Sequence, residues 1–183
     1  KYLDSAHKIC KEFGVNKLGL SIYKKSDLNF SNFNFELINC LQIPVNILDK
    51  RNIILKKDFP NIFFVARSIY LQGLLTSKGI HLLKNSTEEK DKKNAENILK
   101  MVRNYKTNLE TFAIASVLKL SQIDDVIIGI NSFEQLTKTI GFYKDATKLK
   151  DKILEKDYIS NNIESEGETF DRWLPYLSGE KNL

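Results

Sequence analysis

Cysteine, methionine, tryptophan and proline are scarce in this 183-residue chain, which has only two, one, one and three of them. The two cysteines, Cys10 and Cys40, lack the paired spacing of a zinc site, so we expect reduced, buried thiols, no disulfide and no metal. No apolar run approaches the length of a membrane-spanning helix, and the first residues do not resemble a signal peptide. These absences predict a cytoplasmic protein that does not enter a membrane.

Long runs of charge of one sign are also absent. The chain has 28 Lys and Arg against 23 Asp and Glu, which gives a net charge of +5. The densest charged run, residues 88–93, mixes both signs, whereas a nucleic-acid surface needs a basic patch with interleaved aromatics. We therefore expect no nucleic-acid partner, and the positive balance is compatible with an anionic cofactor.

An initiator methionine is missing as well, and residues 1–13 have the apolar spacing of an amphipathic helix in mid-course. We therefore expect the chain to be a piece of a longer protein.

Four short apolar segments alternate with helical or polar stretches along the chain. Strands are expected at residues 15–23, 38–45, 62–66 and 125–129. Helical structure is expected at residues 1–13, 26–37, 94–105 and 108–119, from Ser132 onward, and again at residues 144–156. Residues 46–59 should form a loop with short helical turns, and residues 74–93 a long polar connection. This alternation predicts an α/β protein with a parallel sheet covered by helices.

Each expected strand ends in polar residues, and the most marked case is Arg67-Ser68 after five apolar positions. Ligands of α/β proteins bind at the carboxyl ends of parallel strands. A cation after a buried strand also needs a partner or a ligand. The strand ends therefore predict a shared site.

Structural roles account for several of these residues equally well. Ser21 is by default a turn residue, and Gln42 can satisfy backbone groups at a strand terminus. Ser132 and Gln135 match a helix-capping pattern, and Trp173 suits a packing anchor better than the wall of a substrate pocket.

Four segments at these strand ends resemble, in order, the C-terminal half of the aldo/keto reductases. Leu18-Gly-Leu-Ser-Ile-Tyr resembles the family's "IGVSxY", and the segment from Leu41 to Arg51 resembles "xQxxYNxLxR". Val65-Ala-Arg-Ser-Ile-Tyr-Leu-Gln-Gly-Leu-Leu resembles "xAxSPLxxGLL", and the segment from Val126 to Leu136 resembles "xIPGxxxxEQL". Four matches in the right order are more specific than any one of them.

The resemblance implies a parallel (β/α) half barrel that corresponds to strands 5–8 of a (β/α)8 barrel, with an extra C-terminal helix and a tail. Residues 1–156 would form the half barrel and residues 157–183 the tail. The family's catalytic Asp, Tyr, Lys and His come from the other half, so no catalytic residue is expected in this chain. Neither His7 nor His81 follows a strand in the required way.

The resemblance also implies that this half carries the cofactor site. Ser21 and Gln42 match the positions that hydrogen-bond the nicotinamide carboxamide, and Arg67 stands where many members stack an aromatic residue on the nicotinamide ring. The positions that correspond to the phosphate-binding segments are Ser68, Gln72, Gly73, Gly129, Asn131 and Gln135. NADPH is the expected cofactor, and NADH stays open because Gly129 and Gln135 stand where many NADPH-dependent members have Lys or Arg. Lys138, one turn further on, is a candidate for that role.

Two functional hypotheses follow. In the first, the chain is the cofactor-binding half of an NAD(P)H-dependent aldo/keto reductase, inactive alone, whose parent enzyme reduces a small carbonyl by hydride transfer. In the second, it is a non-catalytic half-barrel interaction module that assembles with the missing N-terminal half, with another partner or with itself. An open half barrel exposes two sheet edges, which favours such assembly.

Overall fold

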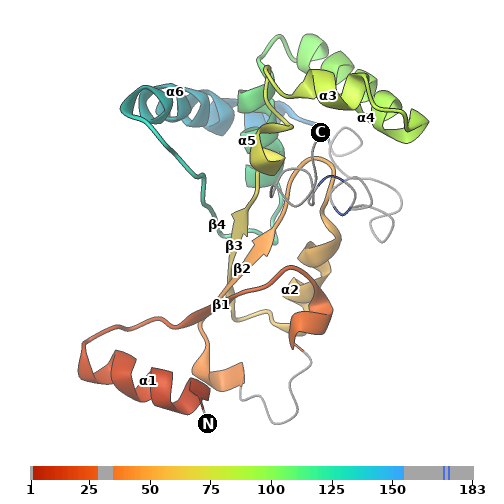
Figure 1. Cartoon of the computed structure of the whole chain (residues 1–183). Coiled ribbons are helices and arrows are strands. Elements are labelled where there is room, and N and C mark those ends of the chain that lie inside the picture. Colours follow the sequence, from red (N-terminus) through yellow and green to blue (C-terminus); the bar gives the residue numbers. More distant parts are fainter. Residues whose placement is uncertain (1, 29–34, 155–170, 172, 174–183) are drawn as a thin grey trace.

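The computed structural model describes residues 2–28, 35–154, 171 and 173. Its centre is a four-stranded parallel sheet in which the strand order equals the chain order (Figure 1). The strands are β1 (Gly19–Ser21), β2 (Cys40–Pro44), β3 (Phe63–Arg67) and β4 (Asp125–Val126). Because each strand pairs with the next one along the chain, the sheet winds in one direction, as in a barrel. The predicted α/β class and parallel sheet are confirmed.

The two faces of the sheet differ in burial, because successive side chains of a strand point to opposite faces. On one face Leu41, Ile43, Phe64 and Ala66 are fully buried. The other face carries Ser21, Gln42 and Phe63, all of which are at least partly exposed. Most of the hydrophobic core therefore lies on one side of the sheet, and Val65, 8% exposed, is a buried apolar residue of the open face.

Helices connect and follow the strands. Figure 1 shows α1 at one end of the molecule and α3, α4, α5 and α6 grouped at the other. Their bounds are α1 (Tyr2–Glu12), α2 (Leu55–Asp58), α3 (Ile80–Lys84), α4 (Glu89–Asn104), α5 (Leu109–Leu118) and α6 (Phe133–Leu149). The short 3₁₀ helices are η1 (Lys25–Leu28), η2 (Phe35–Leu37), η3 (Arg51–Ile54), η4 (Leu71–Gly73) and η5 (Lys150–Lys152). Between α1 and β1, Gly14 adopts φ +68°, a left-handed conformation that ends a helix readily when the residue is glycine.

Several predicted boundaries are wrong. The expected helix at 144–156 is not separate, because α6 runs without a break to Leu149 and continues directly into η5. The expected polar connection at 74–93 contains α3 and the first residues of α4. The strands predicted at 15–23 and 125–129 shorten to three and two residues. Of the helical stretch predicted at 26–37, the structure has η1 and η2, and the part between them lies outside the described residues.

Two described residues near the C-terminus contact the body of the protein. Trp173 packs against the core, as predicted, and its indole Nε1 donates to Asp91 on α4 over 2.9 Å. Asp171 accepts two hydrogen bonds from Arg51, at 2.7 and 2.8 Å. The rest of the predicted tail lies outside the described residues, so its boundary at residue 157 stays a prediction.

Both cysteines are free thiols, as predicted, but neither is fully buried. Cys40 is only partly buried because it lies on the open face of the sheet, in the same strand as Gln42, and burial still raises the pKa of its thiol. Among the described residues, no helix is both long and apolar enough to cross a bilayer.

Candidate functional site

The first two strands bring Ser21 and Gln42 side by side. These residues are register partners in the sheet, and the Ser21 hydroxyl donates to the Gln42 side-chain oxygen over 3.0 Å. Both line a groove on the open face together with Cys40, Phe63 and Val65. A hydroxyl oxygen accepts and an amide nitrogen donates, so the pair retains both kinds of group for a ligand in the groove.

Arg67, at the end of β3, is held against the end of β1. Its guanidinium lies 4.2 Å from the centre of the Tyr23 ring, a cation–π arrangement. One terminal nitrogen donates to the Ile22 carbonyl and the other to the Ser68 hydroxyl, each over 3.2 Å. Its Nε is buried without a hydrogen-bond partner. Within the described part of the chain Arg67 forms no ion pair with a carboxylate, so it is a partly buried cation without a counter-ion.

The backbone after β3 has an unusual conformation. Ser68, Leu71 and Gln72 adopt φ values of 60°, 46° and 51°, and Gly73 one of 97°. Left-handed residues other than glycine are uncommon, and such conformations cluster at ligand-binding loops. The Ser68 carbonyl accepts a hydrogen bond of 3.4 Å from Asn46, which is fully buried at the end of β2.

Asn46 is a residue that sequence analysis did not assign to the site. It also accepts from the Leu48 N–H over 2.9 Å, so its amide fixes the loop after β2 as well as the loop after β3. The signal was available, because an asparagine directly follows the apolar strand. Its position within the "xQxxYNxLxR" resemblance gave a second indication.

A second hollow, of about 690 Å³, lies between the segment after β3 and the first turns of α6. It brings together Gly73 and Gln135 from the predicted set and adds Lys138, which was a candidate. The other polar side chains that line it are Tyr70, Thr76, Ser77, Lys78, Asn108, Glu110, Ser132, Glu134 and Thr139. The Tyr70 hydroxyl is buried without a hydrogen-bond partner, and burial followed by the nearby Glu110 charge raises the pKa of that phenol.

The start of α6 forms a reciprocal capping box. Ser132 accepts from the Gln135 N–H over 3.1 Å, and the Gln135 side chain accepts from the Asn131 N–H over 2.8 Å. The structural role considered for Ser132 and Gln135 is therefore present. Because the cap engages the backbone N–H and the side-chain oxygen of Gln135, the side-chain nitrogen is the only donor that this residue can offer to a ligand.

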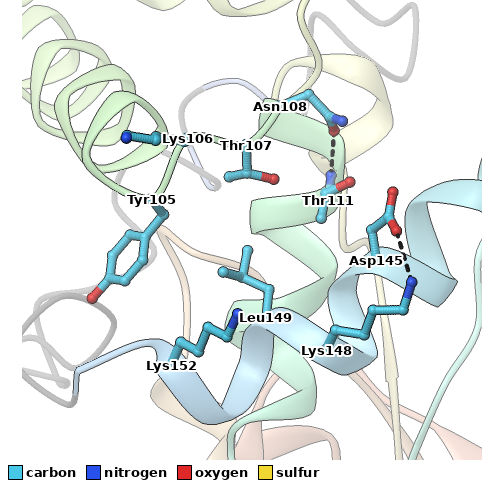
Figure 2. Close-up of a pocket in the computed structure, with 9 residues that line it drawn as sticks. All are labelled: Tyr105, Lys106, Thr107, Asn108, Thr111, Asp145, Lys148, Leu149 and Lys152. Atoms are coloured by element: carbon cyan, nitrogen blue, oxygen red, sulfur yellow. Dashed lines mark hydrogen bonds and ion pairs between the residues drawn. The ribbon is translucent and has the colours of Figure 1, made fainter.

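The predicted residues thus fall into two places. Ser21 and Gln42 line the groove on the sheet, with Arg67 and Ser68 beside it at the strand ends, and Gly73 and Gln135 line the second hollow. Gln72, Gly129 and Asn131 are exposed and line neither. A third hollow, shown in Figure 2, contains none of the predicted residues. Its walls come from the loop before α5 and the end of α6, and Lys148 pairs there with Asp145 over 3.5 Å.

Within the described part of the chain, no histidine lines any of these three hollows. The described residues include no group of three or more His, Cys, Asp or Glu side chains that is able to hold a metal ion. His7 lies on α1, and His81 lies on α3, where its ring contacts the Lys78 carbonyl.

Comparison with known proteins finds similarity among solved structures. No family model matches the sequence, and no curated protein does. Among solved structures, the holo form of the aldo-keto reductase AKR11C1 from Bacillus halodurans matches with a TM-score of 0.50 and 19% sequence identity. The match covers 85% of this chain and 58% of that one. The apo form of the same enzyme matches at 18% identity with a TM-score of 0.48, covering 85% and 59% of the two chains.

The chain therefore spans less than two thirds of the length of the reductase that it matches. Its four parallel strands in chain order, with helices following them, correspond to part of that enzyme's (β/α) barrel. The chain has an aldo/keto reductase-like fold.

Proposed function

We propose that this chain is the cofactor-binding half of an NAD(P)H-dependent oxidoreductase whose complete form reduces a small carbonyl compound. The observation that carries the proposal is the Ser21–Gln42 pair, which is exposed on the sheet beside the unpaired Arg67 cation. A nicotinamide carboxamide has one acceptor and one donor, and the pair offers groups complementary to both. The bound cofactor would supply the hydride.

Unsatisfied polar groups support the fit of an anionic dinucleotide. The Arg67 Nε and the Tyr70 hydroxyl are both buried without partners, and buried polar groups normally have them. Ser132 and Gln135 place the start of α6 at the second hollow, and the N–H groups and positive dipole of a helix N-terminus suit a phosphate. We assign Ser68, Gln72, Gly73, Gly129, Asn131 and Gln135 to the phosphate-binding segments as part of this proposal. NADPH is the proposed cofactor, with Lys138, which pairs with Glu134 over 2.6 Å at the second hollow, as the candidate cation for its 2′-phosphate.

Fluorescence titration of the full chain with NADPH and with NADH tests the proposal. We expect saturable binding that Gln42→Leu weakens and that Asn97→Ala, an exposed change on α4, leaves unchanged. Absence of binding at millimolar cofactor would sink the proposal. The ratio of the two dissociation constants measures the cofactor preference.

A second candidate function is assembly, and exposed apolar side chains favour it. On α6 the residues Phe133, Leu136, Ile140 and Tyr143 recur at the spacing of one helix face and are 39–83% exposed. Near the opposite edge of the sheet Phe13 and Val15 are 80% and 50% exposed. Apolar surface at both edges of an open sheet favours covering by the missing half barrel or by a second copy.

Light scattering on the purified chain separates the two functions. A discrete dimer that binds no nucleotide would support assembly alone, and a monomer that binds nucleotide would support the cofactor-binding function alone. The double variant Leu136→Lys, Ile140→Lys should reduce the mass of any assembly formed through α6. Lys144→Ala, on the same helix, is its control.

A further inference from the structure

We infer that Arg67 makes the proposed site select the reduced over the oxidised form of the nicotinamide cofactor. This inference rests on the proposed function and adds a property that the family likeness does not supply, because an arginine stands here where many members have an aromatic residue. It concerns the charge of the nicotinamide ring. That ring is neutral in NADPH and carries one positive charge in NADP⁺, while the rest of the molecule has the same charge in both.

The position of Arg67 gives the first step. Its terminal nitrogen donates to the Ile22 carbonyl, and Ile22 directly follows Ser21, whose hydroxyl bonds Gln42. A carboxamide held by Ser21 and Gln42 would therefore place its ring near the guanidinium. The stack on Tyr23, together with the bond to the Ser68 hydroxyl, limits the freedom of the side chain to swing away.

The absence of a counter-ion gives the second step. Among the residues that the structure describes, no carboxylate pairs with Arg67, and the nearest bonded groups are a carbonyl, a hydroxyl and an aromatic face. Neutral partners stabilise a guanidinium without cancelling its charge. A partly buried charge acts on a neighbouring charge through a lower effective dielectric than water, so a cationic ring nearby is repelled.

The functional consequence is directional. A site that holds the reduced cofactor and repels the oxidised one binds the hydride donor before reaction and releases its product afterwards. This property suits an enzyme that works as a carbonyl reductase rather than as an alcohol dehydrogenase.

The test is a pair of dissociation constants for each of three proteins. Binding of NADPH to the full chain is followed by its fluorescence, and binding of NADP⁺ by competition. We expect NADPH to bind about tenfold more tightly than NADP⁺, and we expect the ratio to fall toward one in Arg67→Gln. Arg67→Lys keeps the charge and should keep most of the ratio, whereas Arg103→Gln, an exposed change on α4, should not alter it.

The ratio separates an electrostatic role from a structural one. Damage to the site would weaken both forms equally and leave the ratio as it was. An unchanged ratio in Arg67→Gln, with both forms still bound, would overturn this inference and leave the proposed function intact. Failure of the unaltered chain to bind either form would overturn both.

Discussion

Ser21 and Gln42 are joined side chain to side chain across the first two strands, with the hydroxyl donating to the amide oxygen over 3.0 Å. The pair lies on the open face of the sheet, so breaking it should affect a ligand more than it affects folding. In the proposed site, Ser21→Ala should weaken NADPH binding by about two- to tenfold, since one hydrogen bond contributes about 0.5–1.5 kcal/mol. Titration beside Ser26→Ala, an exposed serine on η1, checks this. Equal affinities in the two variants would show that the Ser21 hydroxyl does not contact the cofactor.

Arg51 neutralises a carboxylate that is closed off from water. Its guanidinium lies 3.2 Å from Asp49, whose side chain is 0% exposed. Removing one partner of a buried pair leaves an uncompensated charge, so Arg51→Ala should destabilise the protein by about 3–5 kcal/mol. Urea unfolding measures the loss. The control is Lys25→Ala, which breaks an exposed pair with Asp58 and should cost less than about 1 kcal/mol. Similar losses for both variants would contradict the prediction.

Acid should weaken the link between β3 and the start of β4. Burial opposes ionisation of Asp124, but the Lys56 ammonium at 2.7 Å and the Phe64 N–H at 2.8 Å outweigh it, so the pKa of Asp124 lies below its usual value. Because the folded pKa is the lower one, this stabilisation is complete above the unfolded pKa of about 4 and disappears as the pH falls through the folded value.

Asp124→Asn should therefore be less stable than the unaltered chain at pH 7, and the gap should narrow below about pH 4. Urea midpoints at both pH values measure it. Asp151→Asn, an exposed change on η5, serves as the control. A gap of constant size at both pH values would mean that ionisation of Asp124 does not contribute.

Two glycines should respond in opposite directions to the same substitution. A Cβ on Gly79 would overlap the carbonyl oxygen of Gly73, so Gly79→Ala must displace the segment after β3 and should cost about 1–3 kcal/mol. A Cβ on Gly141, within α6, meets nothing within 4 Å. Gly141→Ala should stabilise the helix by about 0.5–1 kcal/mol. Thermal unfolding should give a lower melting temperature for Gly79→Ala and a higher one for Gly141→Ala. A change in the same direction in both variants would contradict the prediction.

Local patterns in the sequence predicted the parallel sheet and most of its helices. They failed where a distant partner decides the structure. The start of α4 was predicted as a polar connection because it is highly charged, yet Asp91 there is fully buried. It accepts from Ser86 over 3.0 Å and from Trp173, which is 82 residues away. Similarly, α6 continues through Gly141 because one glycine costs only about 1 kcal/mol, and Ala146 beyond it is fully buried.

For the candidate site, too, local patterns indicated individual residues but not the contacts between distant ones. The motif at each strand end identified Ser21 and Gln42 separately, and parallel pairing makes them neighbours. The stack of Arg67 on Tyr23 joins the ends of β3 and β1, which are not adjacent in the sheet. No local sequence pattern predicts a contact between the ends of two strands that are not neighbours in the sheet.

The indole of Trp173 also makes the protein its own optical reporter. It is the only tryptophan in the chain. Fluorescence excited at the long-wavelength edge of tryptophan absorption therefore reports on one site, the contact of Trp173 with Asp91 on α4. Far-ultraviolet circular dichroism follows the helices of the whole chain. If the two signals separate during denaturation, the C-terminal contact detaches independently, and a fluorescence midpoint then measures that detachment rather than the loss of the sheet.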